Sequence, residues 1–212
     1  MDDSVAVVRQ RIAAACVQSD RDPSSVRIIA VSKGRTLADI EHIRQQGLTD
    51  FGENRLQDGL PKVVALPGLT WHFIGHVQSN KARQIAQNFA YVHSVDRVEI
   101  AGKLQGPQIL VEVDYTGIEG RAGVSPGGAE SLVAALIAAG RIPMGLMAVA
   151  PQGDPAAARR CFASLRDLRD GLSSTLGIEL PHLSMGMSDD FEIAVEEGST
   201  MVRIGRALFG AR

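Results

Sequence analysis

Short apolar runs rich in β-branched residues alternate along the chain with longer helical segments. Such runs are typical of strands that are buried on both faces of a parallel sheet. Glycine or polar residues follow the runs and predict a turn before the next helical segment. We expect eight strands, at residues 26–31, 50–52, 71–74, 91–95, 108–113, 144–149, 182–185 and 201–204.

Helix boundary residues mark the segments between these strands. Thr36, followed three residues later by Asp39, predicts a helix N-cap, and Gly47 ends that helix. Pro155 suits the first turn of the longest segment, and Asp96 is the expected cap after the fourth strand. We expect the other helices at residues 54–65, 80–89, 129–139, 155–176, 189–197 and from 206 onward, with an extra helix at 4–16.

Strands that alternate with helices imply right-handed βαβ units and a parallel sheet. Eight strands can close into a barrel, and 212 residues lie at the short end of the usual length. An open, doubly wound sheet is the alternative, but it normally carries a glycine-rich phosphate turn where this chain has Lys33-Gly34-Arg35. We therefore predict an α/β fold in which residues 1–212 form a single (β/α)8 TIM barrel domain with an extra N-terminal helix.

The composition narrows the class of protein. Hydrophobic residues make up 45% and charged residues 22% of the chain, as in ordinary globular proteins. The formal net charge of −2 argues against a general nucleic-acid binder and against a polybasic membrane binder. The N-terminus lacks a basic segment before an apolar stretch, so no secretory signal is expected. Cys16 and Cys161 are too few for a disulfide framework, and we expect a cytoplasmic monomer with both thiols reduced.

In a barrel, functional groups lie at the carboxyl ends of the strands, and phosphates commonly bind in the loops after strands seven and eight. Lys33 follows the first strand, which neighbours the eighth in a closed barrel, so it stands beside these loops. Partial burial at a barrel mouth lowers the pKa of a lysine and allows a Schiff base with an aldehyde. The pattern predicts a phosphorylated aldehyde as the ligand, and a solvated lysine is the simpler alternative.

Two predicted helix starts in the second half of the chain could bind an anion. Ser188, Asp189 and Asp190 precede one helix, and Gly205 and Arg206 begin another. In the structural interpretation, Ser188, Asp189 or Asp190 is a helix N-cap and Gly205 forms a tight turn. The functional interpretation is that the N–H groups of Gly205 and Arg206 hold a phosphate. The residues alone leave both interpretations open.

Histidines provide a further alternative. His72 and His76 are four residues apart, and a zinc site would need a third ligand such as His93. We expect core or hydrogen-bonded histidines instead, and no metal site. The chain also lacks a convincing Ser-His-Asp arrangement.

Six motifs stand in order along the chain: Ala30-Val31-Ser32-Lys33, Phe51-Gly52-Glu53-Asn54, Trp71-His72-Phe73-Ile74-Gly75, Gln78-Ser79-Asn80-Lys81, Leu183-Ser184-Met185-Gly186-Met187-Ser188-Asp189-Asp190 and Met201-Val202-Arg203-Ile204-Gly205. With them the chain resembles the pyridoxal phosphate homeostasis proteins, the YggS/PROSC family, which are similar to the N-terminal barrel of alanine racemase. The resemblance spans nearly the whole chain, and six motifs in the correct order make it specific.

This resemblance implies a barrel that holds pyridoxal 5′-phosphate. Carried over by motif, Lys33 is the Schiff-base lysine, Asn54 neighbours the cofactor ring, and Arg203 is the partner of the pyridine nitrogen. One departure lies after the fifth strand, where Arg121 precedes Gly123 and the family often has a lysine. Any role of that lysine is therefore not carried over to this chain.

The resemblance also implies how the phosphate is held. Ser184 is the expected side-chain ligand, together with the backbone N–H groups of Gly205 and Arg206. Met187 and Ser188 belong to the same binding loop. The family often has threonine or serine where this chain has Arg206, and a guanidinium there suits a phosphate.

The function implied is that of a carrier in pyridoxal phosphate homeostasis. Such a protein holds the cofactor as a lysine aldimine and passes it to apo pyridoxal-phosphate-dependent enzymes, without substantial amino-acid catalysis. A racemase that uses the cofactor and an aldolase that uses Lys33 alone are the alternatives. Amino-acid catalysis requires a positioned acid and base besides the lysine. Neither Tyr91 nor Tyr115 falls in a segment that resembles the second domain of alanine racemase, so the carrier is favoured.

Overall fold

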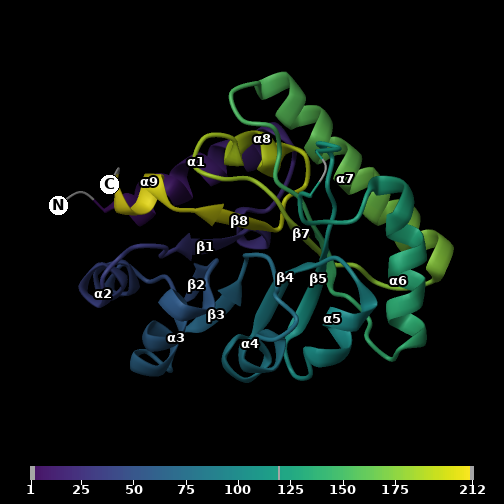
Figure 1. The fold of residues 1–212 in the computed structure, drawn as a ribbon. Helices are drawn as coiled ribbons and strands as arrows, with labels where there is room; N and C mark the ends of the chain where they lie inside the picture. Colours follow the sequence, from purple (N-terminus) through teal and green to yellow (C-terminus); the bar gives the residue numbers. More distant parts are fainter. Residues whose placement is uncertain (1–2, 119, 211–212) are drawn as a thin grey trace.

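The computed structural model describes residues 3–118 and 120–210 and contains a closed barrel of parallel strands (Figure 1). The strands follow one another around the barrel in chain order, and β8 pairs with β1. Their bounds are β1 Arg27–Val31, β2 Asp50–Glu53, β3 Thr70–Phe73, β4 Tyr91–Val95, β5 Gln108–Glu112, β6 Gly145–Met147, β7 His182–Ser184 and β8 Met201–Ile204. The predicted (β/α)8 barrel is confirmed, and the open sheet is excluded because Ile29 of β1 lies beside Arg203 of β8.

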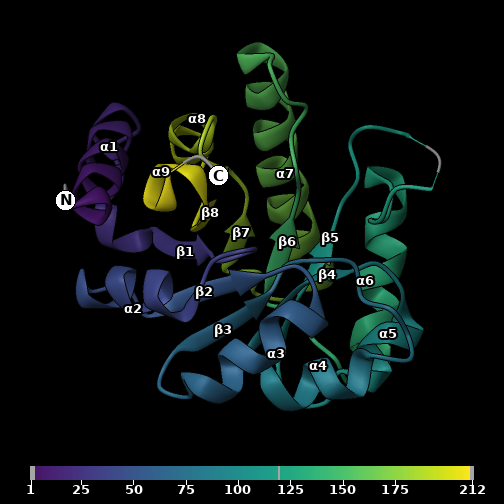
Figure 2. The same cartoon turned by 60° about the vertical axis from the view of Figure 1, so that its left-hand side comes forward.

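A helix follows each strand, and one more helix precedes β1 (Figure 2). Two short 3-10 helices, η1 Pro23–Ser25 and η2 Pro126–Gly128, lie between these elements. The α-helices are α1 Ser4–Gln18, α2 Leu37–Gln45, α3 Leu56–Ala65, α4 Ala82–Asn88, α5 Val98–Lys103, α6 Ala129–Ala138, α7 Pro155–Leu176, α8 Phe191–Glu196 and α9 Arg206–Phe209. No helix in the described part of the chain is long and apolar enough to span a membrane.

Most of the expected helix boundaries are found. Thr36 and Asp39 form a reciprocal capping box at the start of α2, in which each side chain accepts from the backbone N–H of the other. Asp96 does not cap α5, whose N-cap position is Arg97. The carboxylate of Asp96 instead pairs with Arg97 and lies 3.7 Å from a ring nitrogen of His76, so the expectation of a cap there is wrong.

The apolar core has two layers. The larger layer fills the space between the strands and the surrounding helices and contains Phe51, Phe162 and Phe191, all fully buried. The smaller layer, Ile29, Leu110 and Met201, is a separate buried cluster. It belongs to the barrel interior, because these residues lie on three strands at positions that alternate with those facing the helices.

The extra helix α1 packs beside α8 and α9, close to the carboxyl end of the described chain (Figure 2). Its apolar face buries Val5, Val8 and Ile12. Arg11 donates two hydrogen bonds to the carboxylate of Glu192 on α8, at 2.7 and 2.9 Å. Helix α1 therefore supports the part of the barrel from which β7 and β8 lead into their following loops.

Candidate functional site

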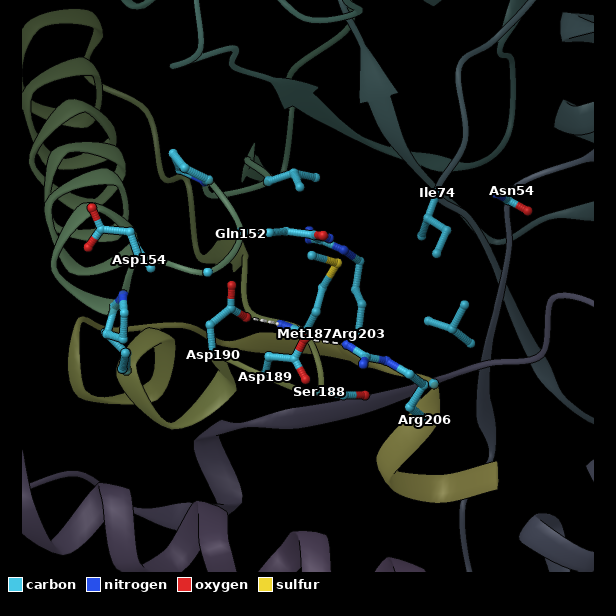
Figure 3. Close-up of a pocket in the computed structure, with 18 of the residues that line it drawn as sticks. Asn54, Ile74, Gln152, Asp154, Met187, Ser188, Asp189, Asp190, Arg203 and Arg206 are labelled. Carbon is cyan, nitrogen blue, oxygen red and sulfur yellow. Dashed lines mark hydrogen bonds and ion pairs between the residues drawn. The ribbon is translucent and has the colours of Figure 1, made fainter. Parts of the chain in front are cut away.

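A cavity of about 630 Å³ opens at the carboxyl ends of the strands, within the range of small-molecule sites (Figure 3). The structure brings seven of the eight predicted binding residues to this cavity: Lys33, Asn54, Met187, Ser188, Arg203, Gly205 and Arg206. The loop after β6, with Gln152 and Asp154, also lines it. Sequence reasoning missed that loop, although its position after a strand end could have indicated it.

Lys33 and Asn54 follow the carboxyl ends of β1 and β2. Lys33 lines the cavity with an exposed side chain, so the partial burial expected for it is not found. Asn54 Oδ1 is buried and has no hydrogen-bond partner in the structure. Residue 75 must be glycine beside it, since a Cβ at Gly75 would lie 2.0 Å from the carbonyl oxygen of Asn54. Figure 3 shows Asn54 and Ile74 across the cavity from Asp189 and Asp190.

A buried ion pair lies behind the turn that carries Lys33. Lys62 Nζ donates to Glu53 Oε1 at 2.6 Å and to the carbonyl oxygen of Ser32 at 2.7 Å. Ser32 Oγ donates to the same Glu53 oxygen at 2.7 Å. Glu53 and Ser32 are fully buried, and Lys62 is 9% exposed. The pair ties β2 and α3 to the residue before Lys33, an arrangement that sequence reasoning did not foresee.

Arg203 projects from β8 at the base of the cavity and is 5% exposed. Its Nη1 donates to the carbonyl oxygen and to Oγ of Ser184, at 2.6 and 2.7 Å, and its Nη2 donates to the carbonyl oxygen of Ala148 at 2.9 Å. Burial lowers the pKa of Arg203 to about 10, an effect that Glu112 and Asp190 oppose. The guanidinium is therefore still a cation at neutral pH, and its plane is fixed by acceptors on two neighbouring strands.

Ser184, the eighth predicted binding residue, does not line the cavity, and its role as a phosphate ligand stays a prediction. The residue is fully buried, and its hydroxyl contacts Arg203 Nη1 and a ring nitrogen of His93. The reason is geometric: Ser184 ends β7 with its side chain inside the barrel, one layer below the mouth. Ser188, four residues later in the loop after β7, reaches the cavity instead.

The loop after β7 and the start of α9 meet at the rim. Ser188 Oγ accepts from the N–H of Ala207 at 3.2 Å, so it joins the loop to the first turn of α9. Gly205 is the N-cap residue of α9, and the first amide groups of a helix have no acceptor within the helix. Arg206 forms an ion pair with Asp189 on the loop after β7 (Figure 3).

The loop after β7 is itself held by Asp190. Asp190 Oδ1 accepts from the N–H of Met187 at 2.6 Å. Burial raises the pKa of Asp190, although the hydrogen bond from Met187 opposes the shift. Asp190 thus occupies the N-cap position of α8, but its side chain stabilises the preceding turn and not the helix amides. The predicted side-chain N-cap of α8 is therefore not found, and the binding of a ligand by this segment stays a prediction.

The histidines do not form a metal site. His72 Nδ1 lies 2.9 Å from His93 Nε2, and both rings are fully buried inside the barrel. His76 is exposed at the mouth and faces Asp96. Within residues 3–118 and 120–210, no group of three or more His, Cys, Asp or Glu side chains could hold a metal ion. Cys16 and Cys161 are both buried and form no disulfide with each other.

Comparison with known proteins identifies the family. The family described as "Alanine racemase, N-terminal domain" matches residues 10–212. The pyridoxal phosphate homeostasis protein of Pseudomonas aeruginosa is 44% identical over 99% of this chain and 95% of its own length. The chain belongs to the pyridoxal phosphate homeostasis protein family. A family member from Aquifex aeolicus is 38% identical over 97% of this chain and 95% of its own length.

Solved structures agree with this assignment. PipY from Synechococcus elongatus, in a structure with pyridoxal phosphate bound, has a TM-score of 0.82 and 34% identity. The match covers 96% of this chain and 100% of that one. Alanine racemase from Corynebacterium glutamicum has a TM-score of 0.70 at 19% identity and covers 96% of this chain, but only 62% of that enzyme. The likeness to the racemase is one of fold alone.

Proposed function

We propose that this protein binds pyridoxal 5′-phosphate in the cavity at the barrel mouth and serves in the homeostasis of this cofactor, holding and releasing it without substantial amino-acid catalysis. The observation that carries the proposal is the meeting of Lys33, Arg203 and the start of α9 in one cavity. The names of the relatives and the cofactor bound to PipY support the same ligand.

The residues of the cavity fit this cofactor. The amides at the start of α9 and the guanidinium of Arg206 provide donors and positive charge for a phosphate. Asn54 also lines the cavity and would contact the cofactor ring. When bound, the cofactor would supply an aldehyde, and Lys33 is the residue of the cavity whose amine would react with it. These residues of three separate loops would hold the phosphate, the ring and the aldehyde.

Arg203 favours holding the cofactor over amino-acid chemistry. A guanidinium is a donor only and stays protonated, so facing the ring nitrogen it would leave that nitrogen unprotonated. An unprotonated ring is a poorer electron sink and stabilises a carbanion less well. Tyr91 and Tyr115 do not line the cavity, so neither provides an acid or base opposite Lys33.

The attachment site is tested by reduction of the loaded protein with borohydride and peptide mass spectrometry. We expect a phosphopyridoxyl group on the peptide that contains Lys33, and loss of the visible absorption band in Lys33→Ala. Lys33 is exposed, so the variant should keep its unfolding free energy within about 0.5 kcal/mol. An adduct on Lys62, Lys81 or Lys103 in its place would overturn the assignment.

Catalysis is tested separately from binding. The loaded protein is incubated with single L-amino acids in deuterated water, and the α-position is followed by NMR. We expect negligible exchange with transfer of the cofactor to added apo-enzymes, whose activity reports the transfer. Rapid α-hydrogen exchange or racemisation that disappears in Lys33→Ala would replace the carrier by a racemase-like enzyme.

A further inference from the structure

Polar side chains form one continuous hydrogen-bonded network through the inside of the barrel. TIM barrel interiors are usually filled by layers of branched apolar residues, so a polar network inside this barrel is unusual. It runs from Arg203 Nη1 to Ser184 Oγ at 2.7 Å, from Ser184 Oγ to His93 Nδ1 at 2.8 Å, from His93 Nε2 to His72 Nδ1 at 2.9 Å, and from His72 Nε2 to Asp50 Oδ1 at 3.0 Å. We call these five residues the interior network.

The chemistry of its ends gives the interior network a single direction. Arg203 can only donate, so Ser184 Oγ accepts from it, and an ionised Asp50 can only accept, so His72 donates to it from Nε2. When both imidazoles are neutral, His72 Nδ1 must then accept from His93 Nε2, and His93 Nδ1 must accept the proton of Ser184 Oγ. For neutral rings, the hydrogen bonds are therefore all satisfied by the Nε2–H tautomer of each imidazole.

The surroundings favour these protonation states. His93 is fully buried, and burial lowers its pKa well below the usual value. Burial also lowers the pKa of His72, against the opposing effect of Asp50. Burial acts to raise the pKa of Asp50, but the hydrogen bond from His72 and the charge of Arg27 hold it below its usual value. The interior network therefore joins a cation to an anion through neutral groups.

The far end of the interior network is anchored at the amino end of the barrel. Asp50 begins β2, and Arg27 Nη1 lies 3.5 Å from its Oδ1. Tyr91 stacks on the ring of His72, with the two ring centres 4.5 Å apart and the planes 8° from parallel. The imidazole of His72 is thus fixed by a carboxylate and by an aromatic face.

At the near end, Arg203 is both part of the interior network and part of the cavity wall. Nη1 donates both of its bonds to Ser184, and Nη2 is held by Ala148. Removing the acceptor Ser184 Oγ, or the His93 ring that orients this hydroxyl, would free one edge of the guanidinium. Because Arg203 lines the cavity, loss of the interior network would affect ligand binding as well as folding.

We propose that Asp50, His72, His93 and Ser184 are positioning residues that orient the Arg203 guanidinium for recognition of the ring nitrogen of the ligand. This inference rests on the proposed function for the identity of the ligand, but the interior network itself is a property of the protein alone. Ser184 thereby acts through Arg203 and not as a phosphate ligand.

The first experiment needs no ligand. NMR of the apo-protein with ¹⁵N-labelled histidine should show two neutral rings protonated on Nε2 at pH 7, assigned by loss of each signal set in His72→Gln and His93→Gln. The proton on His93 Nε2 should exchange slowly with solvent because the ring is fully buried. A charged ring, or a proton on Nδ1 of either residue, would overturn the direction of the interior network.

The second experiment compares pyridoxal phosphate with its 1-deaza analogue, in which a C–H group replaces the ring nitrogen. His93→Leu and Ser184→Ala should weaken binding of pyridoxal phosphate about fivefold to tenfold, because the nitrogen loses an oriented donor. Binding of the analogue should change little in these variants. Ser184→Thr keeps a hydroxyl, so unlike Ser184→Ala it should show the wild-type ratio of the two dissociation constants. His42→Leu is the control, since His42 is exposed on α2 and its ring contacts Gln46, away from the interior network.

Equal losses for the two ligands, or the same ratio change in His42→Leu, would overturn the positioning role. If His93→Leu does not fold, the Ser184→Ala and Ser184→Thr pair decides by the same comparison. If the wild-type protein binds neither ligand, the proposed function fails. The histidine tautomers in the apo-protein would then still decide whether the interior network exists.

Discussion

The turn that carries Lys33 depends on a buried ion pair. Lys62 donates at once to Glu53 and to the backbone of Ser32, so one ammonium fixes both a carboxylate and the residue next to Lys33. Glu53 Oε2 is buried and has no hydrogen-bond partner. The carboxylate is therefore stabilised through its other oxygen, which accepts from Lys62 and Ser32. A charge buried in this way stabilises the fold only while its partners remain in place.

Lys62→Met should therefore lower the unfolding free energy by about 3–5 kcal/mol, because it leaves Glu53 charged and buried. Urea unfolding followed by circular dichroism measures the change. Adding Glu53→Gln to Lys62→Met should recover part of the loss, since the uncompensated charge is then removed.

The matched control for this substitution is Lys103→Met, which replaces an exposed lysine. It should change the unfolding free energy by no more than about 0.5 kcal/mol. Similar losses in Lys62→Met and Lys103→Met would mean that the buried pair contributes little.

Among the elements, the short segment between β7 and α8 forms one wall of the cavity. The predicted helix at 189–197 begins later, at Phe191, because the Asp190 side chain turns back to the N–H of Met187. Gly186 starts this turn with φ of +94°, a backbone conformation that residues with a Cβ rarely adopt. A Cβ there would lie 2.6 Å from Cβ of Ala194. The position of Met187 and Ser188 at the rim therefore depends on a glycine.

Gly186→Ala should destabilise the protein by about 1–3 kcal/mol through backbone strain, and more if α8 cannot move away from the new methyl group. The displaced loop should also weaken binding of pyridoxal phosphate. Thermal unfolding and ligand titration by absorbance measure the two effects.

Gly171→Ala on α7 is the control of opposite sign. Nothing lies within 4 Å of a Cβ at that position, so alanine should stabilise the helix by about 0.5–1 kcal/mol. A Gly186→Ala protein as stable as wild type would show that the turn tolerates a side chain.

At the scale of the whole molecule, the stability of the barrel should depend on pH through Glu112. This residue ends β5, and burial raises its pKa to about 7, with Arg203 opposing and Asp96 reinforcing the shift. The folded state then holds the proton more tightly than the unfolded state. The contribution of Glu112 to the unfolding free energy is therefore most favourable below the pKa that Glu112 has in the unfolded state, near 4.5. This contribution is lost as pH rises through the pKa of the folded state, about 7.

Glu112→Gln removes this titration. Relative to wild type, the variant should gain about 2–3 kcal/mol between pH 5 and pH 8, at about 1.4 kcal/mol for each unit of pKa shift. Urea unfolding of both proteins at the two pH values gives the difference. Glu130→Gln, on the exposed face of α6, should show no such change. A difference between Glu112→Gln and wild type that is the same at both pH values would contradict the prediction.

Local signals in the sequence are enough to predict the barrel and the end of the barrel that holds the cavity. Periodic apolar runs and cap residues are local signals, and α7 has the predicted bounds, Pro155–Leu176. Eight parallel strands joined by right-handed helical crossovers pair in chain order, so the last strand closes the barrel beside the first. The functional loops follow the carboxyl ends of these strands. Position at a strand end therefore predicts Lys33 at the cavity, and the family motifs imply the same for Asn54 and Arg203.

The contacts of the polar side chains inside the barrel depend on parts of the chain that are far apart in sequence. Ser184 and Ser188 lie in one motif, yet one contacts Arg203 below the cavity and the other joins α9 at the rim. His93 and Ser184 are 91 residues apart in sequence but 2.8 Å apart in space. The local pattern determines whether the side chain of a strand residue points into the barrel or toward the helices. The residue that it contacts across the barrel is determined only when all eight strands close.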